Sequence, residues 1–209
     1  MKVKAKRGIS MKEEIKNQSD IMYIDMVAKE MEINLANKHR TVCLHDEVTR
    51  ENIFKCLYWI DKIVISDKKQ GIKEPITISI DCYGGYCYHG LALISRIEQL
   101  RDEGYEIVGI CKGVACSMGS AILNVCSKRK IYRYAMVLIH SVSSGMYGTS
   151  QELQESLDET NRLWKVLKEL YLKYTDIPEE KLDEIILRKQ DWTLDANESL
   201  KYKVVDEIL

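Results

Sequence analysis

Two strand-and-helix units follow one another in the middle of the chain, and they constrain the fold more than any other feature. The first has an alternating strand pattern at 76–80, the glycine pair 84–85 and then a helical apolar period. The second has a strand pattern at 106–110, a turn around Ser117 and a second helical pattern. Repeated units of this kind predict an α/β fold with a largely parallel sheet covered by helices, whose ligand sites lie at the carboxyl ends of strands.

The remaining apolar patterns predict further elements around these units. Helices are expected at 11–35, 49–65, 150–174, 179–188 and 197–201, and strands at 41–44, 131–132 and 135–139. The helix at 150–174 carries an apolar stripe at spacings of three and four residues. At about 1.5 Å per residue it forms a rod of roughly 36 Å. That is longer than one small domain needs, so the helix is expected to project and to pack against another subunit.

The composition limits the class of protein. A chain of 209 residues with 45% apolar residues suits one domain with an extension, here a domain at 37–209 preceded by an amino-terminal arm and helix at 1–36. A net charge of −1 gives no reason to expect nucleic acid or an acidic membrane as partner. No apolar run approaches the roughly 20 residues of a membrane span. The seven cysteines are expected to be free thiols of a cytoplasmic chain.

Neither close pair of cysteines has a usual zinc spacing. Cys82 and Cys87 are separated by four residues, as are Cys111 and Cys116. Both pairs are more simply interpreted as buried free thiols. No metal and no cofactor are therefore expected.

Ser117 lies where a strand pattern gives way to a helix pattern. The first N–H groups of a helix have no partner inside that helix, and they favour an anion. A carbonyl attacked by the Ser117 hydroxyl becomes an oxyanion, so this turn can supply both the nucleophile and part of the charge stabilisation. By itself, however, such a turn is more typical of a helix that packs tightly on a sheet than of a nucleophile.

His140 is the best placed of the four histidines to act as a base for Ser117. It follows the apolar strand at 135–139, so it shares a sheet edge with the serine. The base needs an acid that orients it. Asp158 and Asp183 fall within predicted helices, where solvent is expected to cover them. The spacing leaves Asp191 and Asp195 open as the acid. The other aspartates after His140 are Asp176 and Asp206.

Four segments in order carry a resemblance to a known family. Residues 82–85, Cys-Tyr-Gly-Gly, match its Ser-Pro-Gly-Gly; residues 115–119 match its Ala-Ala-Ser-Met-Gly; residues 137–140 match its Val-Met-Ile-His; and residues 190–206 match its carboxyl-terminal region. From about Arg40 to Leu209 the chain thus resembles the ClpP family, the proteolytic subunits of the Clp protease (peptidase family S14), in the ClpP/crotonase superfamily.

This resemblance implies a serine endopeptidase that works through an acyl-enzyme and needs no cofactor. It implies Ser117 as nucleophile, His140 as base and Asp191, rather than Asp195, as the orienting acid. It also implies that the backbone N–H groups of Gly84 and Met118 form the oxyanion hole.

The resemblance further implies how substrate and subunits are arranged. A peptide or unfolded protein would bind as an added strand beside Gly85 and Tyr86 and beside the loop that begins at Ser141. The helix at 150–174 would interdigitate between two stacked heptameric rings, a tetradecamer that encloses the active sites in a chamber.

The chain also departs from the family pattern. Tyr83 replaces a proline, and residues 86–89 replace a smaller segment, which predicts an altered substrate groove. Ser79 and Lys130 stand where aromatic residues line the docking pocket for an AAA+ unfoldase, so an apolar anchor from such a partner is expected to gain little there. The alternatives are a dedicated processing protease, for example one that matures viral capsids, a non-catalytic scaffold of the same fold, and a crotonase-like acyl-CoA enzyme.

Overall fold

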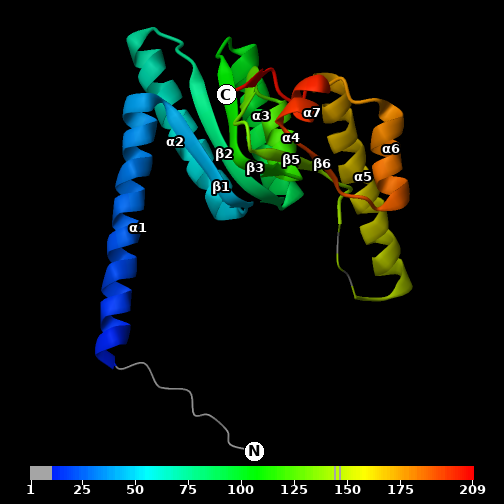
Figure 1. The fold of residues 1–209 in the computed structure, drawn as a ribbon, viewed down its shortest axis with the longest axis horizontal. Coiled ribbons are helices and arrows are strands. Elements are labelled where there is room, and N and C mark those ends of the chain that lie inside the picture. Colours follow the sequence, from blue (N-terminus) through cyan, green and yellow to red (C-terminus); the bar gives the residue numbers. More distant parts are fainter. Residues whose placement is uncertain (1–10, 144, 146) are drawn as a thin grey trace, which may run out of the picture.

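A computed structural model gives the fold and describes residues 11–143, 145 and 147–209. The expected arm at 1–10 and two residues of the loop after His140 lie outside the described residues. In the described part the chain forms one body around a mixed sheet, with one long helix at either side (Figure 1).

The described sheet is almost entirely parallel. Its strands are β1 (Thr41–Val48), β2 (Ile76–Gly85), β3 (Ile107–Cys116), β4 (Lys128–Ile131), β5 (Met136–Ile139), β6 (Trp192–Leu194) and β7 (Glu207–Ile208). The main order is β1-β2-β3-β4-β7, and only β5 and β6 pair in antiparallel fashion. β3 forks: its first half pairs with β4, and residues 114–116 pair with β5. The prediction of a largely parallel α/β sheet is confirmed.

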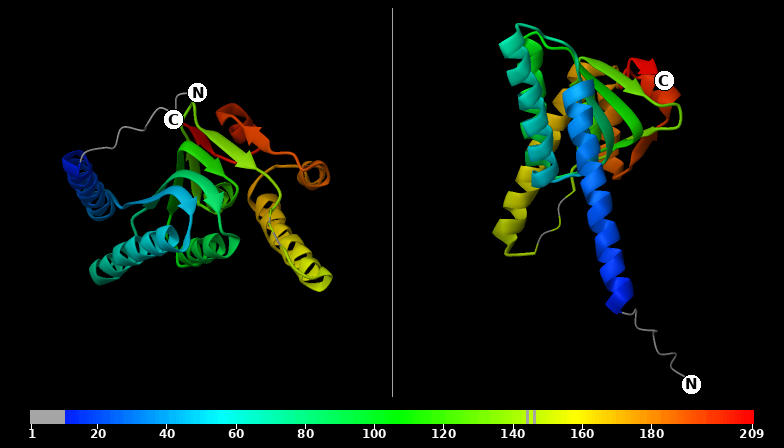
Figure 2. Two further views of the ribbon diagram at one scale, coloured as in Figure 1. Left: turned by 90° about the horizontal axis from the view of Figure 1, so that it is seen from below. Right: turned by 90° about the vertical axis from the view of Figure 1, so that its left-hand side faces the viewer.

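Helices cover this sheet. They are α1 (Met11–His39), α2 (Arg50–Gln70), α3 (Cys87–Asp102), α4 (Met118–Asn124), α5 (Ser150–Tyr174), α6 (Glu179–Arg188) and α7 (Ala196–Lys201). α2 and α3 lie side by side against one face of the sheet (Figure 2, left). The central strand β2 is buried on both faces, since Ile78, Ser79 and Ile80 are all inaccessible to solvent, as is usual for parallel sheets.

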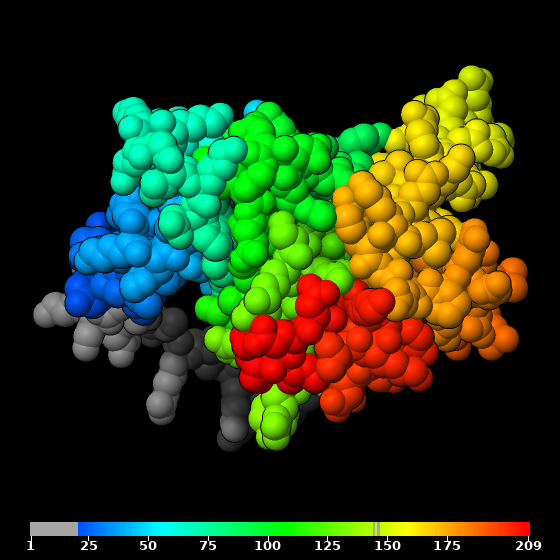
Figure 3. Space-filling model, turned by 90° about the horizontal axis from the view of Figure 1, so that it is seen from above, coloured from blue at the N-terminus to red at the C-terminus, as the bar shows by residue number. Residues whose placement is uncertain are grey.

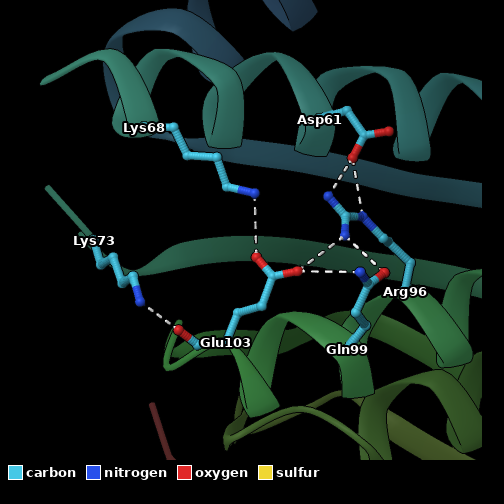
Figure 4. Close-up of polar contacts among 6 residues, drawn as sticks. All are labelled: Asp61, Lys68, Lys73, Arg96, Gln99 and Glu103. Carbon is cyan, nitrogen blue, oxygen red and sulfur yellow. Dashed lines mark hydrogen bonds and ion pairs between the residues drawn. The ribbon is translucent and has the colours of Figure 1, made fainter. Parts of the chain in front are cut away.

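Polar contacts fix the carboxyl-terminal end of α3 (Figure 4). Arg96 of α3 donates two hydrogen bonds to one oxygen of Asp61 on α2, at 2.9 and 2.6 Å. Glu103, just past α3, pairs with Lys68 of α2 and accepts a hydrogen bond from Lys73 at its carbonyl. α3 is thereby held on α2, which leaves its first turn free to face the carboxyl edge of the sheet.

Two helices extend beyond the body. α1 contacts β1 and α2, yet most of its length stands away from the body (Figure 2, right). The amino-terminal half of α5 protrudes at one corner of the molecule (Figure 3). The predicted bounds of α5 and its projection agree with the structure, and a capping box of Thr149 and Glu152 explains where the helix begins. No helix in the described part is both long and apolar enough to cross a membrane.

Several strands run longer than predicted. β1 continues to Val48, β2 to Gly85 and β3 to Cys116, although polar residues and glycines in these segments suggested loops. The parallel pairing continues there through irregular steps, for example between Asp46 and Val48. β6 was not predicted at all, because its three residues form a strand only through pairing with β5.

α2 ends at Gln70 rather than at the predicted Ile65. Gly71 terminates it in the left-handed conformation, with φ +68°. The added turn carries Asp67, whose carboxylate is fully buried and accepts two hydrogen bonds from Arg40, at 2.6 and 2.7 Å. A long-range partner of this kind cannot be recognised from the local pattern.

Candidate active site

Ser117 occupies a strained turn between β3 and α4. Its backbone has φ +53° and ψ −119°, a combination that costs a non-glycine residue on the order of 1–3 kcal/mol. The surroundings hold it there: the Ser117 N–H donates to the carbonyl of Leu138 in β5 at 2.8 Å, and the Ser120 hydroxyl donates to the Ser117 carbonyl at 2.7 Å. The Ser117 side chain is half-buried and is left facing the cleft described below.

The glycine pair at the end of β2 packs directly against this turn. A Cβ added to Gly84 would lie 2.7 Å from the Ser117 Cβ, and one added to Gly85 would lie 2.7 Å from the Val48 carbonyl oxygen. Both glycines also have positive φ, +89° and +143°. Only glycine can therefore occupy these two positions without displacing the serine or β1.

Two backbone amides lie close to one another beside Ser117. The added Cβ of Gly84 would be 3.3 Å from the Met118 nitrogen, so these backbones approach closely. Met118 is the first residue of α4, where an N–H group has no partner within the helix. The Gly84 N–H makes only a weak contact, 3.4 Å to the Cys82 sulfur. This arrangement can present N–H donors to a negative charge at Ser117.

His140 and Asp191 both follow from the end of the β5–β6 ladder. In the β5–β6 ladder Ile139 pairs with Trp192 in antiparallel register. His140 and Asp191 are the next residues along the chain on either side of this pair, so both adjoin the last pair of the ladder. Burial raises the pKa of the Cys116 thiol, and the negative charge of Asp191 raises it further. The Asp191 carboxylate is therefore close enough to interact with the residue that precedes Ser117.

The other aspartates considered as the acid form hydrogen bonds or ion pairs with other residues. Asp195 caps α7 by accepting a hydrogen bond from the Glu198 N–H at 2.8 Å. Asp191 makes no hydrogen bond or ion pair with a described residue. Partners of the remaining four are Gln154 for Asp158, Lys203 for Asp176, Lys168 for Asp183 and Arg129 for Asp206. Among these aspartates, Asp191 is thus the one carboxylate that no described residue engages.

Ser117 and His140 line the same cleft, which has a volume of about 740 Å³. Gly84, Gly85 and Tyr86 line it as well. Among the described residues no hydrogen bond joins Ser117 to His140. Ser141 is half-buried and does not line the cleft, whose wall after His140 is formed by residues 142–143.

The cleft has walls that the sequence did not indicate. α5 contributes residues 156, 159, 160 and 163, which share one face of that helix, and the end of β1 contributes Glu47. The Tyr88 hydroxyl donates a hydrogen bond to Glu159, so α3 and α5 are joined across the cleft. From the sequence, α5 was expected only to pack against another subunit. These four positions recur at spacings of three and four residues and so share one face of the helix. Together with the topology of the fold, that spacing would have predicted that this face lines the cleft.

The prediction of free thiols is confirmed for all seven cysteines. Cys82 and Cys111 are buried, which raises their thiol pKa to about 11 and about 12. Both remain protonated near neutral pH, so neither competes with Ser117 as a nucleophile.

A family profile and individual relatives both match the chain, and they agree on the family. The profile of the Clp protease family matches residues 25–209. The ATP-dependent Clp protease proteolytic subunit of Deinococcus radiodurans is 33% identical over 146 residues, which are 67% of each chain. The ATP-dependent Clp protease proteolytic subunit 2 of Chlamydia abortus is 29% identical over 174 residues, 82% of this chain and 80% of the relative. With a matching profile over most of its length and these relatives, the chain belongs to the Clp protease family.

Proposed function

We propose that the Clp-type peptidase activity of this chain resides in Ser117, His140 and Asp191. The observation that carries this proposal is that Ser117 and His140 line one cleft, while His140 and Asp191 both adjoin the last pair of the β5–β6 ladder. The matched family consists of proteases, which removes support from the acyl-CoA alternative.

The proposed reaction has two halves. The Ser117 oxygen attacks the peptide carbonyl while His140 takes the hydroxyl proton, and Asp191 stabilises the imidazolium that forms. The amides of Gly84 and Met118 bind the oxyanion. His140 then gives its proton to the leaving amine, and the acyl group stays on Ser117. Water attacks this ester with His140 as base, which releases the acid and restores the serine.

A fluorophosphonate probe tests the nucleophile. The probe is expected to label the full chain at Ser117 alone, with the adduct located by peptide mapping. Ser117→Ala is expected to abolish labelling and peptide hydrolysis, whereas Ser143→Ala, in the same cleft, retains both. Labelling at another residue, or unchanged hydrolysis by Ser117→Ala, would refute the assignment.

We also infer that the chain assembles into two stacked rings through α5. The supporting observation is that Leu153 and Leu157 are about half exposed on the protruding half of this helix. Burial of such a stripe against a second copy removes apolar surface from water. Sedimentation is expected to show a particle of fourteen 24.2 kDa chains, roughly 340 kDa. A sample that sediments only as the single chain would contradict this.

A dedicated processing protease remains a second candidate for the biological task. Ser79, at one position expected to form an unfoldase docking pocket, is fully buried, and Lys130, at the other, is ion-paired with Glu207 at 2.9 Å. An apolar anchor gains little against such groups. Peptide hydrolysis is therefore expected to need no ATP, and addition of an AAA+ unfoldase with ATP tests whether folded proteins become substrates. The free thiols support a place in the cytoplasm.

A further inference from the structure

We infer that this cleft selects peptides with a basic side chain, Lys or Arg, close to the scissile bond. The inference rests on the proposed function, because it takes the same cleft as the place where the substrate binds. It uses three observations: the charges along the cleft, the position of Glu47, and the exposed tyrosine rings.

The fixed charges that line the cleft are all negative. They are the carboxylates of Glu47 and Glu159, and no lysine or arginine in the described part of the chain lines it. Glu159 is already engaged: it accepts the Tyr88 hydrogen bond and forms an ion pair with Arg162 at 2.6 Å, outside the cleft. Glu47 is therefore the carboxylate available to a ligand.

Glu47 stands beside the backbone that is expected to hold the peptide. The next residue, Val48, pairs with Gly85, and its carbonyl accepts a hydrogen bond from the Tyr86 N–H at 2.9 Å. The Glu47 side chain is exposed and has no hydrogen bond or ion pair with any described residue. A cation on a bound peptide would thus find a carboxylate that no described residue neutralises.

Three tyrosine rings add a second attraction for a cation. Tyr83, Tyr86 and Tyr88 line the cleft and are 70%, 68% and 63% exposed. The cation–π contacts among the described residues all use rings elsewhere, so these three have no lysine or arginine over them. A tyrosine face attracts ammonium and guanidinium groups, and it also packs against their aliphatic stems.

These features rank the substrates. A basic side chain gains both the rings and Glu47. An aliphatic side chain gains the rings alone, and an acidic one is repelled by Glu47. The largest discrimination is therefore expected between basic and acidic peptides of otherwise identical sequence.

Internally quenched peptides that differ at one position test the ranking. Lys, Arg, norleucine or Glu is placed in turn at each of the positions flanking the bond. At one position at least, kcat/KM is expected to be about tenfold or more higher for Lys than for Glu, equivalent to a free-energy difference of about 1.4 kcal/mol. In Glu47→Gln this ratio is expected to fall to about twofold, the ring contribution alone.

The matched control is Glu51→Gln. It removes the same charge four residues further along, where Glu51 pairs with Lys55 at 3.0 Å outside the cleft, and it is expected to keep the full ratio. Equal kcat/KM for Lys and Glu peptides at every position, or an unchanged ratio in Glu47→Gln, would overturn the inference.

A binding measurement separates this inference from the proposed function. Anisotropy of a labelled Lys peptide on the Ser117→Ala protein is expected to show tighter binding than its Glu counterpart, with the difference shrinking as salt is added. If the fluorophosphonate labels Ser117 but no preference exists, the inference fails and the peptidase assignment stands. If Ser117 is not labelled while the binding preference persists, the peptidase assignment fails and the basic-ligand cleft stands.

Discussion

The two ends of the sheet each hold a non-glycine residue with positive φ, but for different reasons. At the amino end, Arg40 has φ +52°, and its guanidinium donates four hydrogen bonds, two to Asp67 and two to the carbonyls of residues 74 and 75. At the carboxyl end, Ser117 has φ +53°, and its hydroxyl makes no hydrogen bond with a described residue. The strain at Arg40 is offset by its own side chain, whereas the strain at Ser117 is offset only by its neighbours.

This difference separates structural from functional polar groups. Where a polar side chain is paired, its removal should lower the stability of the fold. Where a polar side chain lies in a cleft without a partner, its removal should spare the fold and affect chemistry. Four substitutions, ordered by expected effect, test this comparison.

Asp191→Asn should have the largest effect. The neutral amide cannot stabilise the imidazolium of His140, so kcat should fall by about 10⁴-fold with thermal stability unchanged. The control is Asp195→Asn, which keeps a capping side chain and should retain kcat. Steady-state hydrolysis of a quenched peptide measures both, and equal kcat for Asp191→Asn and the wild type would reject Asp191 as the acid.

Gly84→Ala should reduce kcat by about 10²–10³-fold, the effect of losing one oxyanion donor, because the new Cβ displaces Ser117 or the amide beside it. Gly71→Ala is the matched control. Gly71 also has positive φ, +68°, but no atom lies within 4 Å of the added Cβ. The control should lose about 1 kcal/mol of unfolding free energy and no kcat. Equal losses of kcat in the two variants would show that crowding at Ser117 is unimportant.

Asp67→Asn should lower the unfolding free energy by about 3 kcal/mol, because Arg40 loses its charged partner in a buried site. Asp61→Asn breaks the more exposed pair with Arg96 and should cost less than about 1 kcal/mol. Urea denaturation measures both free energies. Neither variant should change kcat of the folded protein, and a large loss of kcat in Asp67→Asn would mean that the two ends of the sheet are coupled.

Tyr174→Phe should have the smallest effect, about 1 kcal/mol at pH 7. The Tyr174 hydroxyl donates to Glu98 at 2.6 Å, and this hydrogen bond, together with Lys173, lowers the pKa of Glu98 below its ordinary value of 4.5. A lowered folded-state pKa contributes stability above pH 4.5 that is lost as the pH falls through the folded-state value. The difference between Tyr174→Phe and wild type should therefore shrink on acidification, and a difference that grew instead would contradict this assignment.

The sequence allowed the parallel sheet, the long helix α5 and the common sheet edge of Ser117 and His140 to be predicted, because these depend on local periodicity and on the shared direction of parallel strands. The choice of Asp191 over Asp195 needed either the family resemblance or the β5–β6 register. That register joins segments about fifty residues apart. The cleft wall from α5 and the Tyr88–Glu159 hydrogen bond depend on how helices pack over the sheet, which no local pattern specifies.

Because β6 pairs only with β5, the proposed site can be completed only late in synthesis, after residues 191–194 have left the ribosome. Ser117 and His140 leave the ribosome well before residues 191–194, and β6 places Asp191 only by pairing with a β5 that is already formed. A nascent chain thus carries the proposed nucleophile and base before the proposed acid. The proposed triad is therefore incomplete in each new chain until translation is nearly over.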